Sequence, residues 1–100
     1  GDMDVFATPA LVALMENAAM NAVKSALPEG STTVGAMIQT SHIKPSAVGE
    51  TVKATAVLQE VDGRKLTFSV SAVDSQGAVG EGTHIRYVVD RERFLAKLKK

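Results

Sequence analysis

The 100-residue chain contains no cysteine. This absence excludes disulfide bonds, thiol nucleophiles, iron–sulfur clusters and zinc–thiolate sites. Any metal or acid–base chemistry must therefore use the two histidines and the carboxylates. Neither histidine has carboxylates spaced around it as metal ligands are, so the sequence predicts no metal site.

Aromatic residues and an excess of charge of one sign are also lacking. The 11 basic and 11 acidic side chains give a formal net charge of zero, and aromatic residues make up only 4% of the chain. A strong positive field, which drives non-specific nucleic-acid binding, is therefore missing. Few side chains could stack on bases. We expect no nucleic-acid partner.

No apolar run is long enough to cross a bilayer. The longest nearly apolar run, residues 9–15, is followed at once by Glu16 and falls far short of the roughly 20 residues that a spanning helix needs. The first four residues include two aspartates and no basic residue, whereas a signal peptide begins with a basic region. The sequence predicts a soluble, cytoplasmic protein with no membrane partner, folded as a single domain over residues 1–100.

The first predicted element is a long apolar helix over residues 9–26. Thr8 followed by Pro9 is typical of a helix start, and Pro28 to Gly30 form a turn that ends it. Apolar side chains cover most of the circumference of this helix. We expect the rest of the chain to wrap it.

Four later segments are rich in β-branched residues and alternate with a period of two, which predicts strands. They are residues 32–42, 50–61, 64–74 and 78–89. Asp62-Gly63 predicts a tight hairpin between the second and third strands, and residues 75–77 a turn into the fourth. The longer link over residues 42–49 predicts a crossover. The basic tail from Asp90 predicts a short helix or a frayed end.

One apolar helix followed by four antiparallel strands predicts an α+β domain whose curved sheet surrounds the helix. The sheet would have exposed edges, which favours self-association.

Glu16 interrupts an apolar face of the predicted helix. It lies roughly 80 to 180° around the helix from the polar stripe, and its neighbours three and four positions away are apolar. The stripe is Asn17, Asn21, Lys24 and Ser25, and the neighbours are Val12, Ala13, Ala19 and Met20. A carboxylate in this setting is a candidate base or nucleophile. The alternative is a carboxylate at the rim of the helix that reaches water or caps a strand amide.

The two histidines occupy different predicted strands. His42 ends the first strand on the parity of residues 34, 36, 38 and 40, which we expect to face the helix. It is either an acid–base group or a hydrogen-bonded structural histidine. His84 and Arg86 alternate with Thr83, Ile85 and Tyr87, which we expect to form the apolar face. His84 is therefore predicted to lie at the surface or at an interface.

Thr8 and Gly35 each have a structural and a functional interpretation. Thr8 is a helix N-cap, or a hydroxyl at a helix start where free amides favour developing negative charge. Gly35 lies inside a strand pattern that glycine weakens. It marks either a β-bulge or a backbone amide exposed to an oxyanion.

Several motifs together resemble those of one family. They are residues 5–9 (Val-Phe-Ala-Thr-Pro), Leu14-Met15-Glu16, Val34-Gly35, Ser41-His42, residues 61–68 (Val-Asp-Gly-Arg-Lys-Leu-Thr-Phe) and Gly82-Thr83-His84. In order and spacing, the chain resembles the hot-dog fold thioesterases over nearly its whole length, most closely the fluoroacetyl-CoA thioesterase group.

The resemblance implies a hot-dog fold and hydrolysis of a short-chain acyl-CoA. It implies that Thr8, Glu16 and His42 are catalytic and that Gly35 and Phe6 bind substrate. It also implies no cofactor, since coenzyme A enters as part of the substrate, and a homodimer or dimer of dimers with its pockets between subunits. Thr8 and Glu16 lie about 12 Å apart along one helix, so we expect His42 or a second subunit to bridge them.

Two segments depart from the family's pattern. Almost nothing precedes residues 5–9, so the N-terminal strand and lid are expected to be missing or short. Residues 43–47 replace a family motif that follows the histidine, so selectivity for a fluorinated acyl group is not inferred. Two alternatives stay open: a non-catalytic acyl-CoA-binding or regulatory domain, and a hydratase acting on an enoyl thioester.

Overall fold

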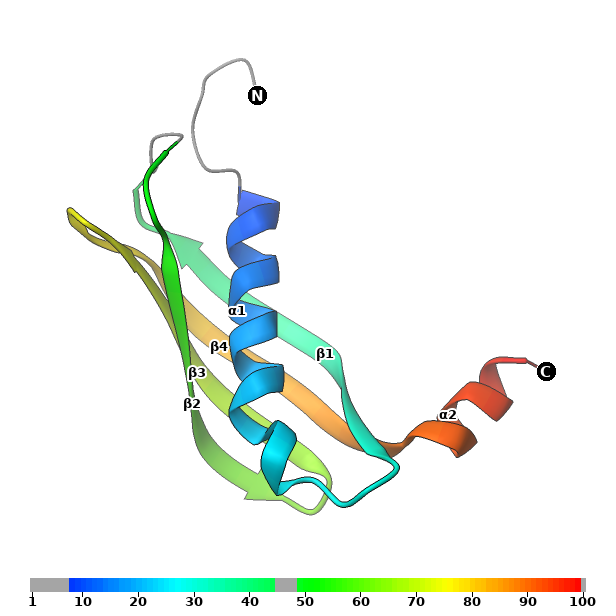
Figure 1. Ribbon diagram of the computed structural model, residues 1–100. Helices are drawn as coiled ribbons and strands as arrows, with labels where there is room; N and C mark the ends of the chain where they lie inside the picture. The colour runs from blue at the N-terminus through cyan, green and yellow to red at the C-terminus, as the bar shows by residue number, and fades with distance from the viewer. Residues whose placement is uncertain (1–7, 45–48, 100) are drawn as a thin grey trace.

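A computed structural model describes residues 8–44 and 49–99 of the chain. Its elements in chain order are α1 (Thr8–Val23), the 3-10 helix η1 (Lys24–Ala26), β1 (Ser31–His42), β2 (Lys53–Asp62), β3 (Lys65–Asp74), β4 (Gly77–Asp90) and α2 (Arg91–Leu98). The four strands form one curved sheet, and α1 lies across its concave face (Figure 1). This arrangement confirms the α+β class predicted from the sequence.

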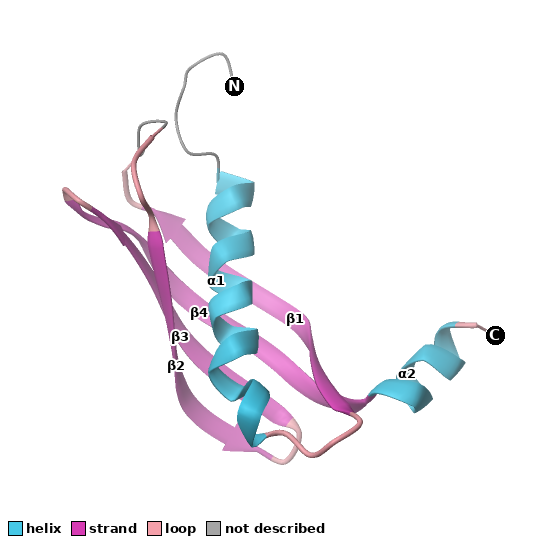
Figure 2. Cartoon of the chain, viewed as in Figure 1, coloured by secondary structure: helices cyan, strands magenta, loops and turns pink. Residues whose placement is uncertain are grey.

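The sheet is antiparallel throughout, with strand order β1-β4-β3-β2 (Figure 2). Since β1 and β2 lie at opposite edges, the chain crosses the sheet between them, as the long link predicts. The β2–β3 turn consists of Gly63 and Arg64, one position later than predicted, because Asp62 pairs with Lys65. Gly63 has a φ of 59°, a left-handed conformation that favours glycine.

The core forms where one stripe of α1 meets the middle of the sheet. Leu11, Met15, Ala19 and Val23 recur at every fourth position and are all buried. This spacing places them on one side of a helix with 3.6 residues per turn. They pack with buried residues of β3 and β4, namely Leu66, Phe68, Val70, Ala72 and Val79.

The wrapping of α1 is less complete than its composition predicts. Ala13 and Ala22 are exposed, and the side chain of Met20 is 36% exposed. The physical reason is that a single four-stranded sheet covers only one side of a helix. One apolar flank of α1 therefore has no cover among the described residues.

Strand β1 contains a β-bulge at Ala36. Gly35 pairs with Arg86 of β4, but Met37 pairs with the next residue, Ile85, so Ala36 has no partner position of its own. Residues 33 and 35 face α1 before the bulge, and residues 38, 40 and 42 do so after it. The prediction that Val34 and Ala36 share the inner face with His42 is therefore wrong, because it assumed an unbroken alternation.

The predicted C-terminal helix is present as α2. The carboxylate of Asp90 caps it by accepting a hydrogen bond of 2.9 Å from the backbone amide of Arg93. The amide of Arg91 donates to the carbonyl of Gly30, which ties the start of α2 to the turn before β1. Among the described helices, none is long and apolar enough to span a membrane.

Candidate active site

Thr8 and His42 meet across the fold. Thr8 begins α1 and His42 ends β1, and a hydrogen bond of 2.8 Å joins Oγ1 of Thr8 to Nδ1 of His42. The other ring nitrogen of His42, Nε2, is buried and has no hydrogen-bond partner among the residues that the structure describes. Two of the three predicted catalytic residues are thus in direct contact.

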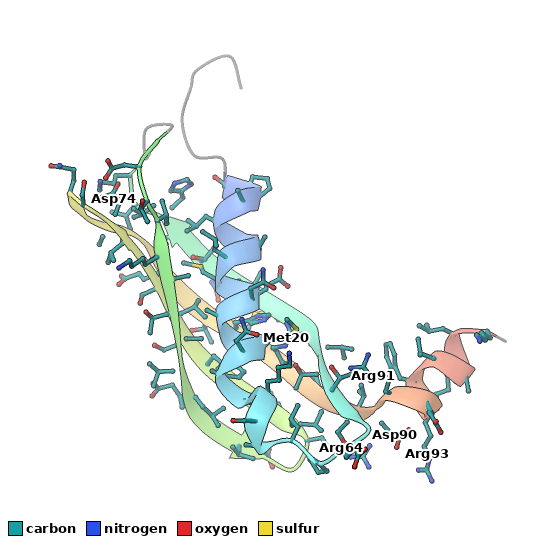
Figure 3. All side chains as sticks on the ribbon, in the orientation of Figure 1. Met20, Arg64, Asp74, Asp90, Arg91 and Arg93 are labelled. Atoms are coloured by element: carbon teal, nitrogen blue, oxygen red, sulfur yellow. The ribbon has the colours of Figure 1, made fainter. Side chains whose placement is uncertain are left out.

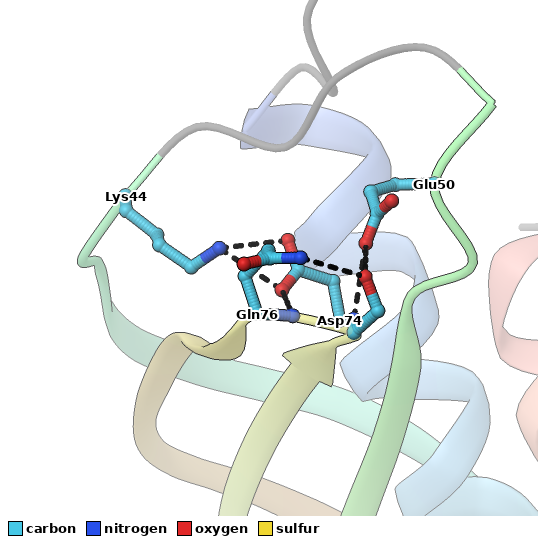
Figure 4. Close-up of polar contacts among 5 residues, drawn as sticks. Lys44, Glu50, Asp74 and Gln76 are labelled. Carbon is cyan, nitrogen blue, oxygen red and sulfur yellow. Dashed lines mark hydrogen bonds and ion pairs between the residues drawn. The ribbon is translucent and has the colours of Figure 1, made fainter.

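A polar network anchors the chain just beyond His42 (Figure 4). Lys44 Nζ lies 2.9 Å and 2.8 Å from the two carboxylate oxygens of Asp74, at the turn between β3 and β4. The same turn is held by Glu50, whose carboxylate accepts hydrogen bonds from the amide and the hydroxyl of Ser75. Since Lys44 is two residues from His42, this network fixes the strand end that carries the histidine.

Glu16, the third predicted catalytic residue, lies two turns further along α1 and faces Gly35. A Cβ atom placed on Gly35 would lie 3.2 Å from Oε2 of Glu16, 3.3 Å from Nη1 of Arg86 and 3.4 Å from Cε1 of His84. Three polar side chains therefore converge on the space that the glycine leaves free. The sequence offers a β-bulge as the structural explanation of Gly35, and a bulge does follow this glycine. The close approach of three side chains is a second reason for a glycine at this position.

Arg86 is the buried positive charge of this group. Its Nε donates to Oγ1 of Thr33 at 2.8 Å, its Nη2 donates to the carbonyl of Thr33 at 2.9 Å, and its Nη1 lies 3.2 Å from Nε2 of His84. Desolvation lowers the pKa of Arg86, and the nearby charge of Glu16 opposes that shift. No direct ion pair forms between these two described residues.

The prediction for His84 is wrong. Its side chain is 0% exposed and lies on the inner face of β4 beside Phe68, with ring centroids 6.4 Å apart. Tyr87, assigned to the apolar face, is instead 39% exposed on the outer face. Hydrogen bonds to Met37 and Arg86 satisfy both ring nitrogens of His84, so that a polar residue can occupy the core.

Arg86 and Thr33 are the residues of this group that sequence reasoning missed. Hydrophobicity alone selects Ile85 and Tyr87 for the inner face of β4 and therefore predicts that Arg86 lies on the outer face with His84. One signal could have corrected that choice. His84 and Arg86 share their parity with Gly80 and Gly82, and small residues facing α1 leave room for a helix to approach.

A hollow of about 350 Å³ opens near this group, between the end of α1 and the start of β1. Met20 and Arg91 line it (Figure 3), together with Leu27 and Thr33. Thr33 therefore lines the hollow and also accepts a hydrogen bond from the guanidinium of Arg86. In the described part of the chain, no group of three or more histidines and carboxylates could hold a metal ion.

The site residues thus form two groups along α1. Thr8 contacts His42 at the start of the helix, and Glu16 approaches Gly35 and Arg86 at its middle. Phe6, which the resemblance implies to be a substrate-binding residue, lies outside the described residues.

Comparison with known proteins identifies the family. Residues 1–92 match the model of the family described as fluoroacetyl-CoA-specific thioesterase. The chain belongs to this family. It is 41% identical, over 96 residues, to the fluoroacetyl-CoA thioesterase of Streptantibioticus cattleyicolor, covering 96% of this chain and 69% of that protein.

Solved structures of a thioesterase and of a hot-dog-like protein share the fold of this family member. One is a crystal structure of a mutant fluoroacetyl-CoA-specific thioesterase in complex with fluoroacetate and CoA. It has a TM-score of 0.91 and 41% identity, covering 95% of this chain and 74% of that one. A hot-dog-like protein from Thermanaerovibrio acidaminovorans matches with a TM-score of 0.89 at 26% identity, covering 95% and 70%. The hot-dog fold and the thioesterase family expected from the motifs are confirmed.

Proposed function

We propose that this fluoroacetyl-CoA thioesterase family member hydrolyses short-chain acyl-CoA in the cytoplasm, with Thr8, Glu16 and His42 as its catalytic residues. Family membership supports the reaction, and the 2.8 Å hydrogen bond between Thr8 and His42 is the observation that carries the residue assignment. Coenzyme A takes part only as a portion of the substrate and product. No separate cofactor is needed for the chemistry below.

The Thr8–His42 contact suits a hydroxyl that is oriented by an imidazole. If the hydroxyl of Thr8 donates to Nδ1, the neutral ring carries its proton on Nε2. That buried Nε2–H can then donate a hydrogen bond to the sulfur of the leaving thiolate and stabilise its charge without giving up the proton. The hydroxyl hydrogen of Thr8 is used in this contact, so the backbone amide of Gly35 would orient the thioester carbonyl oxygen, with the two groups acting on one substrate across the subunits of the proposed dimer.

Glu16 provides the carboxylate for the bond-breaking step, by one of two routes. As a nucleophile, it attacks the thioester carbonyl, expels coenzyme A and forms an anhydride that water then hydrolyses. As a general base, it removes a proton from a water molecule that attacks the same carbonyl. Both routes give the free acid and the thiol.

The decisive experiment measures thiol release from a panel of acyl-CoA substrates, including acetyl-CoA and fluoroacetyl-CoA. We expect wild-type protein to release free thiol and the Glu16→Gln variant to lose about 10²-fold or more in kcat, because an amide is similar in shape but cannot act as base or nucleophile. Thermal unfolding of both proteins provides the control for folding. Wild-type turnover in the variant would make Glu16 a rim residue, and acyl-CoA binding without thiol release would support the non-catalytic alternative.

The proposed active form is a homodimer or a dimer of dimers. Strands β1 and β2 are the two edges of the sheet, and the uncovered flank of α1 adds exposed apolar surface around Met20. Sedimentation at micromolar concentration should therefore give a species heavier than 10.5 kDa. A species of only that mass would contradict the proposal.

A further inference from the structure

We propose that His84 is a positioning residue that holds the guanidinium of Arg86 in a fixed orientation toward Glu16. The inference rests on the proposed function, since it assigns a task within the same site. His84 lies fully inside the core and contacts Arg86 rather than solvent.

The hydrogen bonds of His84 determine which ring nitrogen carries the proton. Nδ1 lies 2.7 Å from the carbonyl oxygen of Met37, which can only accept, so Nδ1 must carry a hydrogen. Nε2 lies 3.2 Å from Nη1 of Arg86, which can only donate, so Nε2 must be the acceptor. His84 is therefore neutral and in its Nδ1–H form.

This form of His84 completes the restraint on Arg86. Thr33 holds the Nε and Nη2 side of the guanidinium, and His84 holds Nη1. Three of the five N–H groups of an arginine are then used, and the plane of the guanidinium cannot rotate. Nη1 is the atom of Arg86 that lies closest to the space beside Gly35, where the carboxylate of Glu16 approaches as well.

The consequence is a positive charge with a fixed direction beside the reacting carboxylate. A preorganised charge stabilises a developing negative charge without reorganising during the reaction. Without the acceptor on His84, the Nη1 side of Arg86 would be free to move relative to Glu16. The expected effect is a lower kcat with little change in KM.

Two conservative variants separate this role from a structural one. In His84→Gln, the side-chain oxygen can reach the position of Nε2 and accept from Arg86. In His84→Asn, the amide nitrogen can reach the position of Nδ1 and donate to Met37, but nothing accepts from Arg86. His84→Phe keeps the ring next to Phe68 and removes both hydrogen bonds.

We expect His84→Gln to stay within about threefold of the wild-type kcat, and His84→Asn and His84→Phe to lose about tenfold. Because His84→Gln and His84→Asn each give up one buried hydrogen bond, their unfolding temperatures should fall by similar amounts, so a difference in stability does not explain the difference in kcat. Adding His84→Phe to an Arg86→Met variant should cost no further activity, since the effect acts through Arg86. Rescue by asparagine instead of glutamine, or equal losses in all three single variants, would overturn the proposal.

Nitrogen-15 NMR of histidine-labelled wild-type protein tests the same proposal without any activity measurement. The expected spectrum shows a protonated Nδ1 and an unprotonated Nε2 for His84. An Nε2–H form or an imidazolium would overturn the proposal. If the wild-type protein released no thiol from any acyl-CoA, the proposed function would fail, whereas the NMR result would still decide the hydrogen bonding of His84.

Discussion

The substitution Gly35→Ala tests whether the space beside Gly35 is needed for chemistry or only for folding. Gly35 does not have a positive φ, so alanine is compatible with the backbone. The added Cβ, however, would lie 3.2 Å from Oε2 of Glu16 and 3.3 Å from Nη1 of Arg86. These contacts are tighter than van der Waals packing normally allows, so the neighbouring atoms must move by a few tenths of an ångström.

The side chain of Glu16 is the part that can move most easily, because it is the end of a flexible chain on a partly exposed residue. Misplacement of a catalytic group by about 1 Å can cost about 10²-fold in rate. A shift of a few tenths of an ångström should therefore lower kcat by about tenfold, which is about 1.4 kcal/mol in activation free energy. Alanine also restricts the unfolded chain more than glycine, which favours folding by about 0.4–1 kcal/mol.

The assay measures kcat and the unfolding temperature of the same preparations. We expect Gly35→Ala to be slower than wild type and equally or slightly more stable. Ala36→Ser is the matched control, because Ala36 is adjacent in sequence, is exposed and has no partner position in the β1–β4 ladder. Full activity in Gly35→Ala would refute the assignment of Glu16 and Arg86 to the site. A marked loss of stability would show that the glycine is needed for the packing of α1 against β1.

Further predictions concern the rest of the site and the fold. In the thiol-release assay, His42→Ala should lower kcat/KM by about 10²-fold or more, while Thr8→Ser should retain more activity than Thr8→Ala because it keeps the hydroxyl. Phe68→Ala should lower the free energy of unfolding by about 3–5 kcal/mol in urea titrations, since Phe68 is fully buried. Gly82→Ala should destabilise the protein by more than the roughly 1–3 kcal/mol typical of overpacking, because its Cβ would lie 2.1 Å from the carbonyl oxygen of Gln39. An unchanged unfolding temperature would contradict this packing argument.

Local signals in the sequence were sufficient to predict the elements of the fold. The alternation of apolar and polar residues predicts four strands, and the observed strands begin and end within three residues of those predictions. The long link after His42 predicts the crossover between sheet edges. These features depend on period, turn residues and loop length, all of which can be read along the chain.

Which face of a strand is buried was harder to predict. On β4, hydrophobicity favours Ile85 and Tyr87 as inward residues, yet His84 and Arg86 occupy the core. Their burial is stabilised by hydrogen bonds to Thr33 and to the carbonyl of Met37, and those partners come from β1. A pattern within one strand contains no information about partners on another.

The bulge in β1 also has a consequence for comparing family members. Gly35 and His42 both face α1, although they are seven positions apart. In a regular strand, residues on the same face are separated by an even number, so an odd separation requires one extra residue between them. A relative with an even separation between the corresponding glycine and histidine would need no bulge to present both residues to its helix. The parity of this interval, counted directly in a sequence, therefore indicates whether the two halves of the site are connected by a regular strand or by a kinked one.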